Sequence, residues 1–298
     1  MTLTLATTAD SAQPTGAIPS LPDAVLKPLV DAALAEDLGM AGDITTTATI
    51  AEETEITAHL TARADGVVAG MDLARFAFTA MDAGLQINIA CTDGTRVKAG
   101  EVLATISGKA RSILSAERVA LNFLTHLSGI ATATAQAVAE AASTGSATRI
   151  AATRKTTPGL RAVEKQAVIA GGGTPHRYGL FDAVMIKDNH IAACGSIADA
   201  IHSARAHIGH TVKIEVEVDH LNQIPEALEA GADILLLDNM TPDQIRSALK
   251  LIDGRAVTEA SGSIRGGRIA AYAKTGVDLI SLGYITHSAP QLDIGLDL

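Results

Sequence analysis

The C-terminal half of the chain contains short, β-rich apolar runs that recur at a nearly constant spacing. From residue 212 onward these runs begin 21, 23 and 22 residues apart, which suits a repeating unit of one strand, one helix and two loops. The pattern predicts an α/β fold with a parallel sheet, either open or closed into an incomplete barrel. The predicted strands are 148–153, 182–187, 212–218, 233–238, 256–260 and 278–283.

The segments between the later strands carry recognisable helix ends. Ser196 is predicted to cap a helix that reaches residue 207, and Thr241 followed by Pro242 reads as an N-cap with proline in the first turn. Gly231 and Gly276 stand where glycines stop helices. These signals support alternating strands and helices.

Almost every predicted strand ends in a polar or small residue. Parallel α/β folds bind ligands at the C-terminal ends of their strands, and in barrels these ends meet on one face. Polar residues also mark ordinary exits into solvent, but six in succession, with both charge signs, favour a shared site. The strand-end residues are Arg154 and Lys155, Lys187 and Asp188, Glu217 and Asp219, Asp238 and Asn239, Ser261, and Gly283.

The region before residue 130 has short strand-like pieces and turn signals instead. Segment 93–110 resembles a barrel-sandwich hairpin of the lipoyl or biotinyl type, but no lysine occupies the tip, so we expect a structural role. A helical stretch over 115–142 joins the two regions, with Val119, Phe123 and Leu127 on one face. Arg118 lies beside this stripe, where it can project towards another chain or domain.

Charge is distributed unevenly along the chain. The total of 23 basic and 33 acidic residues gives a net charge of −10, which argues against a nucleic-acid or anionic-membrane binder. Residues 96–187 nevertheless contain 12 basic and 5 acidic residues, a local charge of +7. This basic window predicts a small anionic partner.

Several features predict a cytoplasmic location. The two cysteines, Cys91 and Cys194, lack metal-type spacing and fit a reducing compartment. No apolar run reaches the roughly 18 residues of a membrane span. Residues 1–20 have no basic residue, unlike a signal peptide, and are predicted to form a disordered tail.

The chemistry-bearing side chains fall into three groups. Glu217 and Asp238 offer hard oxygen ligands suited to Mg²⁺ or to ribose hydroxyls. Residues 261–263 and 283–284 follow the last two strands, where (β/α) barrels commonly bind phosphate. Together with the basic window they predict an enzyme that joins a multiply anionic small molecule to a phosphorylated sugar with magnesium. The basic side chains are Arg118, Arg154, Lys155, His176, Arg177 and Lys187.

At this point the sequence resembles a known family. The blocks ATRKTTPGLRAVEKQAV, GGGTPHRYGLFDAVMIKDNH, IEVEV, LLLDNM, EASGSI and GYITHSAPQLDIGLDL are similar to those of the quinolinate phosphoribosyltransferases. The resemblance implies the type II phosphoribosyltransferase architecture, an N-terminal α/β sandwich over 21–129 and an incomplete α/β barrel catalytic domain over 130–286. It also implies that 287–298 packs back on the first domain.

The resemblance further implies a homodimer in which Arg118 of one subunit completes the site of the other. It implies catalytic roles for Lys155, Lys187, Glu217 and Asp238, with Mg²⁺ held at Glu217 and Asp238 directly or through water or substrate. Ser263 and Tyr284 depart from the residues that are commoner in the family. The implied substrate-binding residues are Arg118, Thr153, Arg154, Lys155, His176, Arg177, Lys187, Glu217, Asp238, Ser261, Gly262, Ser263, Leu282, Gly283 and Tyr284.

The implied reaction transfers phosphoribosyl from phosphoribosyl pyrophosphate to quinolinate, with loss of CO₂, in NAD biosynthesis. Three alternatives remain open at the level of sequence. A paralogue of the same fold would act on another small anion such as nicotinate, and a Schiff-base lyase would use Lys187 as its amine. A non-catalytic module built on segment 93–110 is the third.

Overall fold

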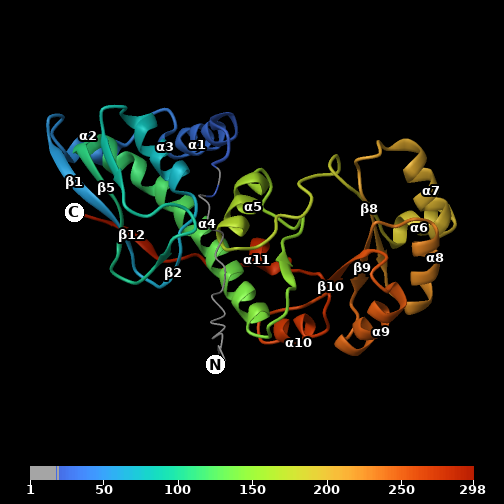
Figure 1. Ribbon diagram of the computed structural model, residues 1–298. Coiled ribbons are helices and arrows are strands. Elements are labelled where there is room, and N and C mark those ends of the chain that lie inside the picture. Colours follow the sequence, from blue (N-terminus) through green and yellow to red (C-terminus); the bar gives the residue numbers. More distant parts are fainter. Residues whose placement is uncertain (1–17, 19) are drawn as a thin grey trace, which may run out of the picture.

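The computed structural model describes residues 18 and 20–298. The predicted tail, residues 1–20, therefore lies almost wholly outside the described residues. The chain forms two units that are joined by one long helix (Figure 1). One unit is built on a four-stranded sheet and the other on a six-stranded sheet.

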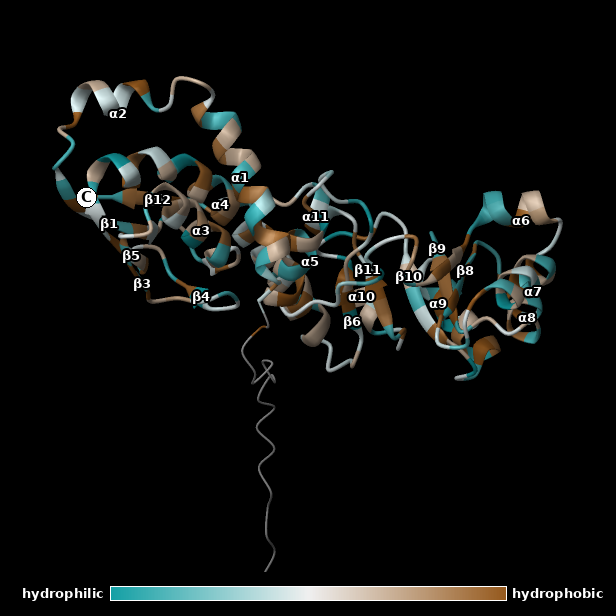
Figure 2. Cartoon of the chain, turned by 90° about the horizontal axis from the view of Figure 1, so that it is seen from above, coloured by the Kyte–Doolittle hydropathy of each residue, from teal (hydrophilic) through white to brown (hydrophobic). Residues whose placement is uncertain are grey.

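The N-terminal unit is a two-layer α/β sandwich. Its four-stranded sheet has the order β12-β1-β5-β3 and is antiparallel throughout. Helices α1, α3 and α4 pack against one another, and α4 contacts β1, β5 and β12. Figure 2 shows these helices together on one side of the strands. The elements are α1 (Asp23–Leu38), α2 (Ile44–Thr49), β1 (Glu55–Ala62), β2 (Gly66–Val67), α3 (Met71–Met81), β3 (Gln86–Ile89), β4 (Arg96–Val97), β5 (Val102–Lys109) and β12 (Ile294–Asp297).

The two strands of segment 93–110 belong to different sheets. β4 pairs with β2 in a small two-stranded sheet, whereas β5 pairs with β1 and β3. The expectation that this segment forms a hairpin of two mutually paired strands is therefore wrong. A turn through Gly100 separates them, and each strand finds its partner elsewhere.

Helix α4 (Ala110–Ala142) connects the two units. It runs for 33 residues without a break and begins earlier than the predicted 115. Its apolar face packs into the first unit, and its later turns contact β6, α5 and α10 of the second. The position of Gly129 within the helix matters, because an added Cβ would lie 2.2 Å from the carbonyl oxygen of Pro290. The returning C-terminal segment crosses the helix at this point.

The second unit contains the predicted parallel sheet of six strands, with the order β6-β11-β10-β9-β8-β7. All six sequence-predicted strands are confirmed, with ends shifted by one or two residues in most cases. The sheet curves with β6 and β7 at its two edges, and these edges do not pair with each other among the described residues. The barrel is thus open along one seam. The strands are β6 (Arg149–Ala151), β7 (Val184–Ile186), β8 (Ile214–Val218), β9 (Ile234–Asp238), β10 (Val257–Ser261) and β11 (Leu279–Ser281).

Helices surround this sheet with the predicted ends. The hydroxyl of Ser196 accepts a hydrogen bond from the amide of Asp199, and that of Thr241 accepts one from the amide of Gln244. Figure 2 shows hydrophobic strands and helices whose outer faces are more hydrophilic. The helices are α5 (Arg161–Ala170), α6 (Asp188–Cys194), α7 (Ile197–His207), η1 (Leu221–Gln223), α8 (Ile224–Glu229), α9 (Pro242–Ile252), α10 (Ile269–Ala273) and α11 (Tyr284–His287).

The C-terminal strand returns to the first unit, where β12 pairs with β1. Among the described residues, no helix is both long enough and apolar enough to cross a membrane.

Candidate active site

The inner face of the six-stranded sheet carries carboxylates. Side chains alternate between the two faces of a strand, so Glu215 and Glu217 of β8 share one face. The register pairs both Glu217 and Glu259 with Leu236 of β9, which places the three acids on the same side. Asp238, at the end of β9, pairs with Ser261 and lies on this face as well.

At the C-terminal ends of the strands, three carboxylates converge. Oxygen atoms of Glu217, Asp219 and Asp238 lie within 4.8 Å of one another. The ammonium group of Lys187 lies 2.5 Å from Oε2 of Glu217, so the end of β7 supplies a cation to the same cluster. Clustered carboxylate oxygens suit Mg²⁺, which prefers hard oxygen ligands and keeps several waters. The structure therefore brings together Lys187, Glu217 and Asp238, and it places the strand-end residue Asp219 in the same cluster.

Lys155 lies at the opposite edge of the same face. Its amide bonds to the hydroxyl of Thr153 at 3.1 Å, and its carbonyl accepts a bond from the hydroxyl of Thr286 at 2.8 Å. Its side chain passes close to Gly283, since a Cβ on Gly283 would lie 3.2 Å from Cδ of Lys155. The loop after β6 and the end of β11 thus meet, as the strand-end pattern predicts.

His176 reaches the barrel interior from the loop between α5 and β7. Its Nε2 lies 3.5 Å from Oε2 of Glu215 and 3.3 Å from Oε1 of Glu259, both of which are buried. Burial alone would lower the pKa of His176, but the two carboxylates outweigh it and raise the pKa to about 9. The amide of Arg177 donates to Nδ1 at 2.7 Å, a bond that only the neutral ring accepts. The two carboxylates therefore favour the charged ring, whereas the bond from Arg177 favours the neutral ring with its proton on Nε2, facing the carboxylates.

Glu215 and Glu259 are site residues that the sequence reasoning missed. Burial raises the pKa of Glu215; His176 opposes this rise and Glu259 reinforces it. A strand that is buried on both faces ordinarily reads as a continuous apolar run. An acidic residue inside such a run therefore indicates a buried functional group. The runs 214–218 and 257–261 contain such acids within the strands rather than at their ends.

Two guanidinium groups come from the two edges of the sheet, since Arg154 follows β6 and Arg177 contacts β7. Arg177 donates from NH1 to the carbonyl of Ala183 at 3.1 Å and from NH2 to the sulfur of Met185 at 3.4 Å. The Nε atom of Arg154 is buried and has no hydrogen-bond partner in the part of the chain that is described. Burial of a guanidinium donor without a partner is costly, which fits a ligand-binding position.

The predicted phosphate segment follows β10 in a tight turn. An added Cβ at Gly262 would lie 2.2 Å from Oδ1 of Asn239, so this position requires glycine. Ser263 adopts φ of 49°, in the left-handed region. That conformation suits glycine and costs a residue such as serine roughly 1–2 kcal/mol, which explains in physical terms why Ser263 is unusual here. Tyr284 begins α11, and its ring centroid lies 5.7 Å from the guanidinium carbon of Arg265.

Arg118 is exposed on the first third of α4, which packs in the N-terminal unit. Within the described chain it makes no recorded contact with the strand-end residues. The structure thus brings the other basic residues to the barrel face but not Arg118.

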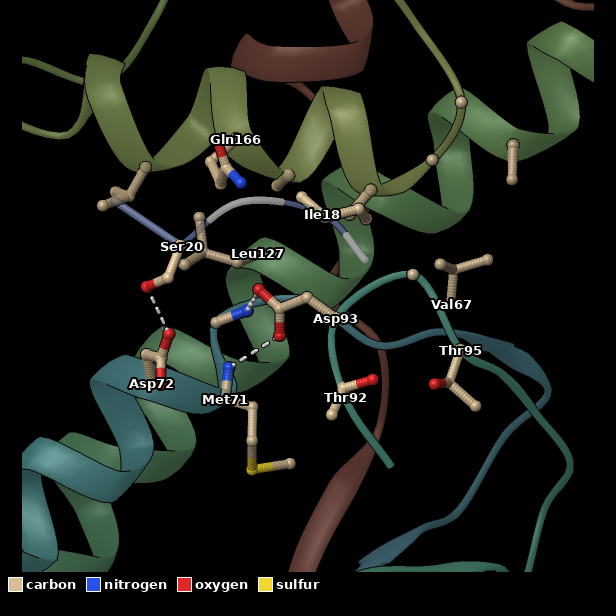
Figure 3. A pocket seen from close by; sticks show the side chains of 18 of the residues that line it. Ile18, Ser20, Val67, Met71, Asp72, Thr92, Asp93, Thr95, Leu127 and Gln166 are labelled. Atoms are coloured by element: carbon tan, nitrogen blue, oxygen red, sulfur yellow. Dashed lines mark hydrogen bonds between the residues drawn. The ribbon is translucent and has the colours of Figure 1, made fainter. Parts of the chain in front are cut away.

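A cavity of about 790 Å³ lies elsewhere, between α3, α4, α5 and the loop 92–96 (Figure 3). Its lining is mostly apolar, and Ile18 and Leu21 border it. Asp93 accepts hydrogen bonds from the amides of Gly70 and Met71, both at 3.0 Å, and so stabilises the start of α3. Burial raises the pKa of Asp93. The carboxylate of Asp93 therefore has a structural role. We place the reaction at the C-terminal ends of the barrel strands.

Comparisons with known proteins give matches over both units of the chain. Residues 43–128 match the family description "Quinolinate phosphoribosyl transferase, N-terminal domain", and residues 130–297 match "Quinolinate phosphoribosyl transferase, C-terminal domain". A relative from Bacillus subtilis, named probable nicotinate-nucleotide pyrophosphorylase [carboxylating], is 45% identical over 273 residues. That alignment covers 92% of this chain and 93% of the relative.

Solved structures give the same result. The nicotinate-nucleotide pyrophosphorylase of Francisella tularensis matches with a TM-score of 0.89 and 39% identity, over 95% of this chain and 99% of that one. NadC of Streptococcus pyogenes matches with a TM-score of 0.90 and 41% identity, over 94% and 98% of the two chains. Human nicotinic acid phosphoribosyltransferase, at 12% identity and a TM-score of 0.59, shares the fold alone. With matches over both units of the fold, the chain belongs to the quinolinate phosphoribosyl transferase family.

Proposed function

We propose that this chain transfers the phosphoribosyl group of phosphoribosyl pyrophosphate to quinolinate and releases CO₂, which yields nicotinate mononucleotide and pyrophosphate. The observation that carries this proposal is the arrangement of charges on one barrel face. Lys155 follows β6, and His176 faces the buried acids Glu215 and Glu259. Arg177 contacts Met185 of β7, and the Lys187–Glu217 pair lies beside Asp238. A dicarboxylate and a phosphorylated, metal-binding sugar need this combination of cations and acids.

The reaction needs positioning and charge stabilisation more than a covalent protein nucleophile. The quinolinate nitrogen forms a bond to C1 of the ribose as the bond to pyrophosphate breaks, through an oxocarbenium-like state. Glu217 and Asp238 face the ribose in this proposal and stabilise its developing positive charge. Lys155 and Lys187 stabilise the negative charge on the phosphates and carboxylates.

Decarboxylation follows from the product of the first step. The ring nitrogen is now positively charged, so the electron pair left at C2 when CO₂ departs is stabilised, and a proton then replaces the carboxylate.

Glu217, Asp219 and Asp238 would hold Mg²⁺, which would neutralise charge on the departing pyrophosphate.

The Schiff-base alternative is less well supported by the geometry. The side-chain nitrogen of Lys187 lies 2.5 Å from a carboxylate oxygen of Glu217, and this contact engages the atom that would have to attack a carbonyl carbon. Borohydride trapping with a carbonyl substrate would favour the lyase.

We further propose a cytoplasmic location, since Cys91 and Cys194 are both unpaired thiols.

One assay tests the main proposal. The protein is mixed with Mg²⁺, phosphoribosyl pyrophosphate and either quinolinate or nicotinate, and mononucleotide and CO₂ are measured. We expect turnover with quinolinate and CO₂ in equal amount to mononucleotide. Turnover with nicotinate but not with quinolinate would show instead that the chain is a paralogue that acts on another small anion.

We also propose a homodimer in which Arg118 completes the partner's site. Support comes from its exposure on α4 and its separation from the other basic residues of its own chain. Mixing two inactive variants, Arg118→Ala and Lys187→Ala, tests this. Random exchange of subunits in a two-fold symmetric dimer would restore about one quarter of wild-type activity. No recovery after verified exchange would contradict the shared site.

A further inference from the structure

Helix α5 lies between the two loops that carry the basic side chains of the site. The first loop, 152–160, follows β6 and contains Arg154 and Lys155. The second, 171–183, contains His176 and Arg177. It starts beside β6, where Thr174 bridges to Ala151, and ends at β7, so it spans the open seam of the barrel.

Lys165 of α5 is fully buried, which is unusual for a lysine. Its ammonium group donates to the carbonyl oxygen of Pro175 and lies 5.4 Å from the ring centroid of Tyr178. Burial, with a smaller contribution from Arg161, lowers the pKa of Lys165 to about 8. The ammonium group of Lys165 is therefore shielded from water, and it contacts the second loop at Pro175, before His176, and at Tyr178, after it.

The contact with Pro175 bears directly on His176. The peptide plane between the two residues holds the Pro175 carbonyl, and rotation relative to that plane is the φ angle of His176. This angle is 55°, which few non-glycine residues adopt. Lys165 thus fixes the backbone of His176 in a sparsely populated conformation, while Glu215 and Glu259 face its ring.

Glu164, the preceding residue, is also fully buried and holds the first loop. Its Oε2 accepts a hydrogen bond from the amide of Thr157 at 3.1 Å, and its Oε1 lies 2.9 Å from Nε2 of His126 on α4. The loop with Arg154 and Lys155 is thereby tied to the long helix through one carboxylate.

Arg161 joins both loops at the start of the helix. Its Nε donates to the hydroxyl of Thr156 at 3.0 Å, and its NH1 donates to the carbonyl of Tyr178 at 3.1 Å. Three charged side chains within five positions of α5 therefore contact the backbone or side chains of both cation-bearing loops.

We propose that Arg161, Glu164 and Lys165 are positioning residues, which hold the two loops across the barrel seam so that Arg154, Lys155, His176 and Arg177 meet the substrate in fixed geometry. The proposal rests on the proposed function, because the substrates define the measurement. It predicts that the loss of Lys165 and the loss of Arg161 affect the binding of the two substrates differently. Among the described residues, Lys165 bonds to the second loop, which carries His176 and Arg177, so its loss weakens quinolinate binding. Arg161 touches both loops, so its loss weakens binding of both substrates.

The test compares steady-state kinetics of Lys165→Met with those of wild type and Val163→Ala. Val163 lies on the same helix and is also buried, but its side chain lines the cavity beside α5 and has no polar atom that could bond to either loop. We expect Lys165→Met to raise KM for quinolinate at least tenfold, with KM for phosphoribosyl pyrophosphate within twofold and kcat within threefold. Val163→Ala should lower thermal stability without changing either KM by more than twofold.

The outcomes separate the two proposals. Absence of quinolinate turnover by wild type overturns the proposed function. If wild type is active and Lys165→Met leaves both KM values unchanged, the positioning role alone is overturned. The same holds if Lys165→Met raises both KM values by the same factor and lowers stability. If Lys165→Met does not fold, Arg161→Met, at a half-buried position, replaces it. An increase of at least threefold in both KM values supports the proposal, and no increase refutes it.

Discussion

Replacing Arg177 with alanine probes the proposed contact between the protein and the quinolinate carboxylates. The guanidinium group is held from one side by the carbonyl of Ala183 and the sulfur of Met185. These bonds use two of its five N–H donors, which leaves enough for a two-pronged contact with a carboxylate. The side chain is thus oriented before substrate arrives.

The expected magnitude follows from the number of bonds lost. Two charge-assisted hydrogen bonds contribute at least ~1.5 kcal/mol each, so Arg177→Ala should cost about 3 kcal/mol of transition-state stabilisation. Since about 1.4 kcal/mol is a factor of ten, kcat/KM for quinolinate should fall roughly 150-fold. Arg177→Lys should recover only part of this loss, because lysine cannot form the planar fork.

The assay is a steady-state measurement of kcat/KM for quinolinate at saturating phosphoribosyl pyrophosphate. Arg205→Ala is the control, since Arg205 binds Asp233 at 2.8 Å beside the start of β9, away from the strand ends that form the site. A loss of less than about threefold in Arg177→Ala, equivalent to ~0.7 kcal/mol, would refute the assignment of Arg177 to the dicarboxylate.

Three further outcomes are expected. Asp233 is bonded to Lys213, Arg205 and the amide of Ile214, and despite burial these partners lower its pKa to about 2. Its ~2 kcal/mol of stability should be fully present above its unfolded pKa of about 4 and lost as the pH falls towards 2, so urea unfolding of wild type and Asp233→Asn should converge at low pH. Gly129→Ala should destabilise the protein by ~1–3 kcal/mol in thermal melts, because the added methyl meets the Pro290 carbonyl. Chelation of Mg²⁺ should abolish turnover reversibly, and Asp238→Asn should raise the Mg²⁺ concentration for half-maximal rate at least tenfold; an unchanged Mg²⁺ dependence would contradict the metal assignment.

The strands of the barrel could be predicted because their signals are local. Each run is apolar, short and followed by a polar residue, and the repeat spacing gives the topology. The register that places Glu217 beside Asp238 is not local, but it follows once parallel strands are assumed. The N-terminal unit was harder, because β4 and β5 are adjacent in sequence yet pair with different partners.

The interior acids illustrate a different difficulty. Attention to strand ends finds Glu217 and Asp238 but passes over Glu215 and Glu259, which lie within the strands. Their meaning depends on His176, which arrives from a loop almost forty residues before Glu215. The buried charges of α5 were equally hidden, since Lys165 bonds to a backbone carbonyl, and Glu164 bonds to a backbone amide and to a histidine of another helix.

The path of the chain makes the two units inseparable as expression fragments. From α1 the polypeptide runs through the first unit, enters the barrel through α4 and returns to supply β12 as the edge strand beside β1. A fragment beginning at residue 130 would cut a helix of about 50 Å near its middle and carry away one strand of the sheet left behind. Each half would expose apolar surface that the other now covers. Evolution can vary the strand-end loops independently, but the units themselves must be inherited, synthesised and folded as one piece.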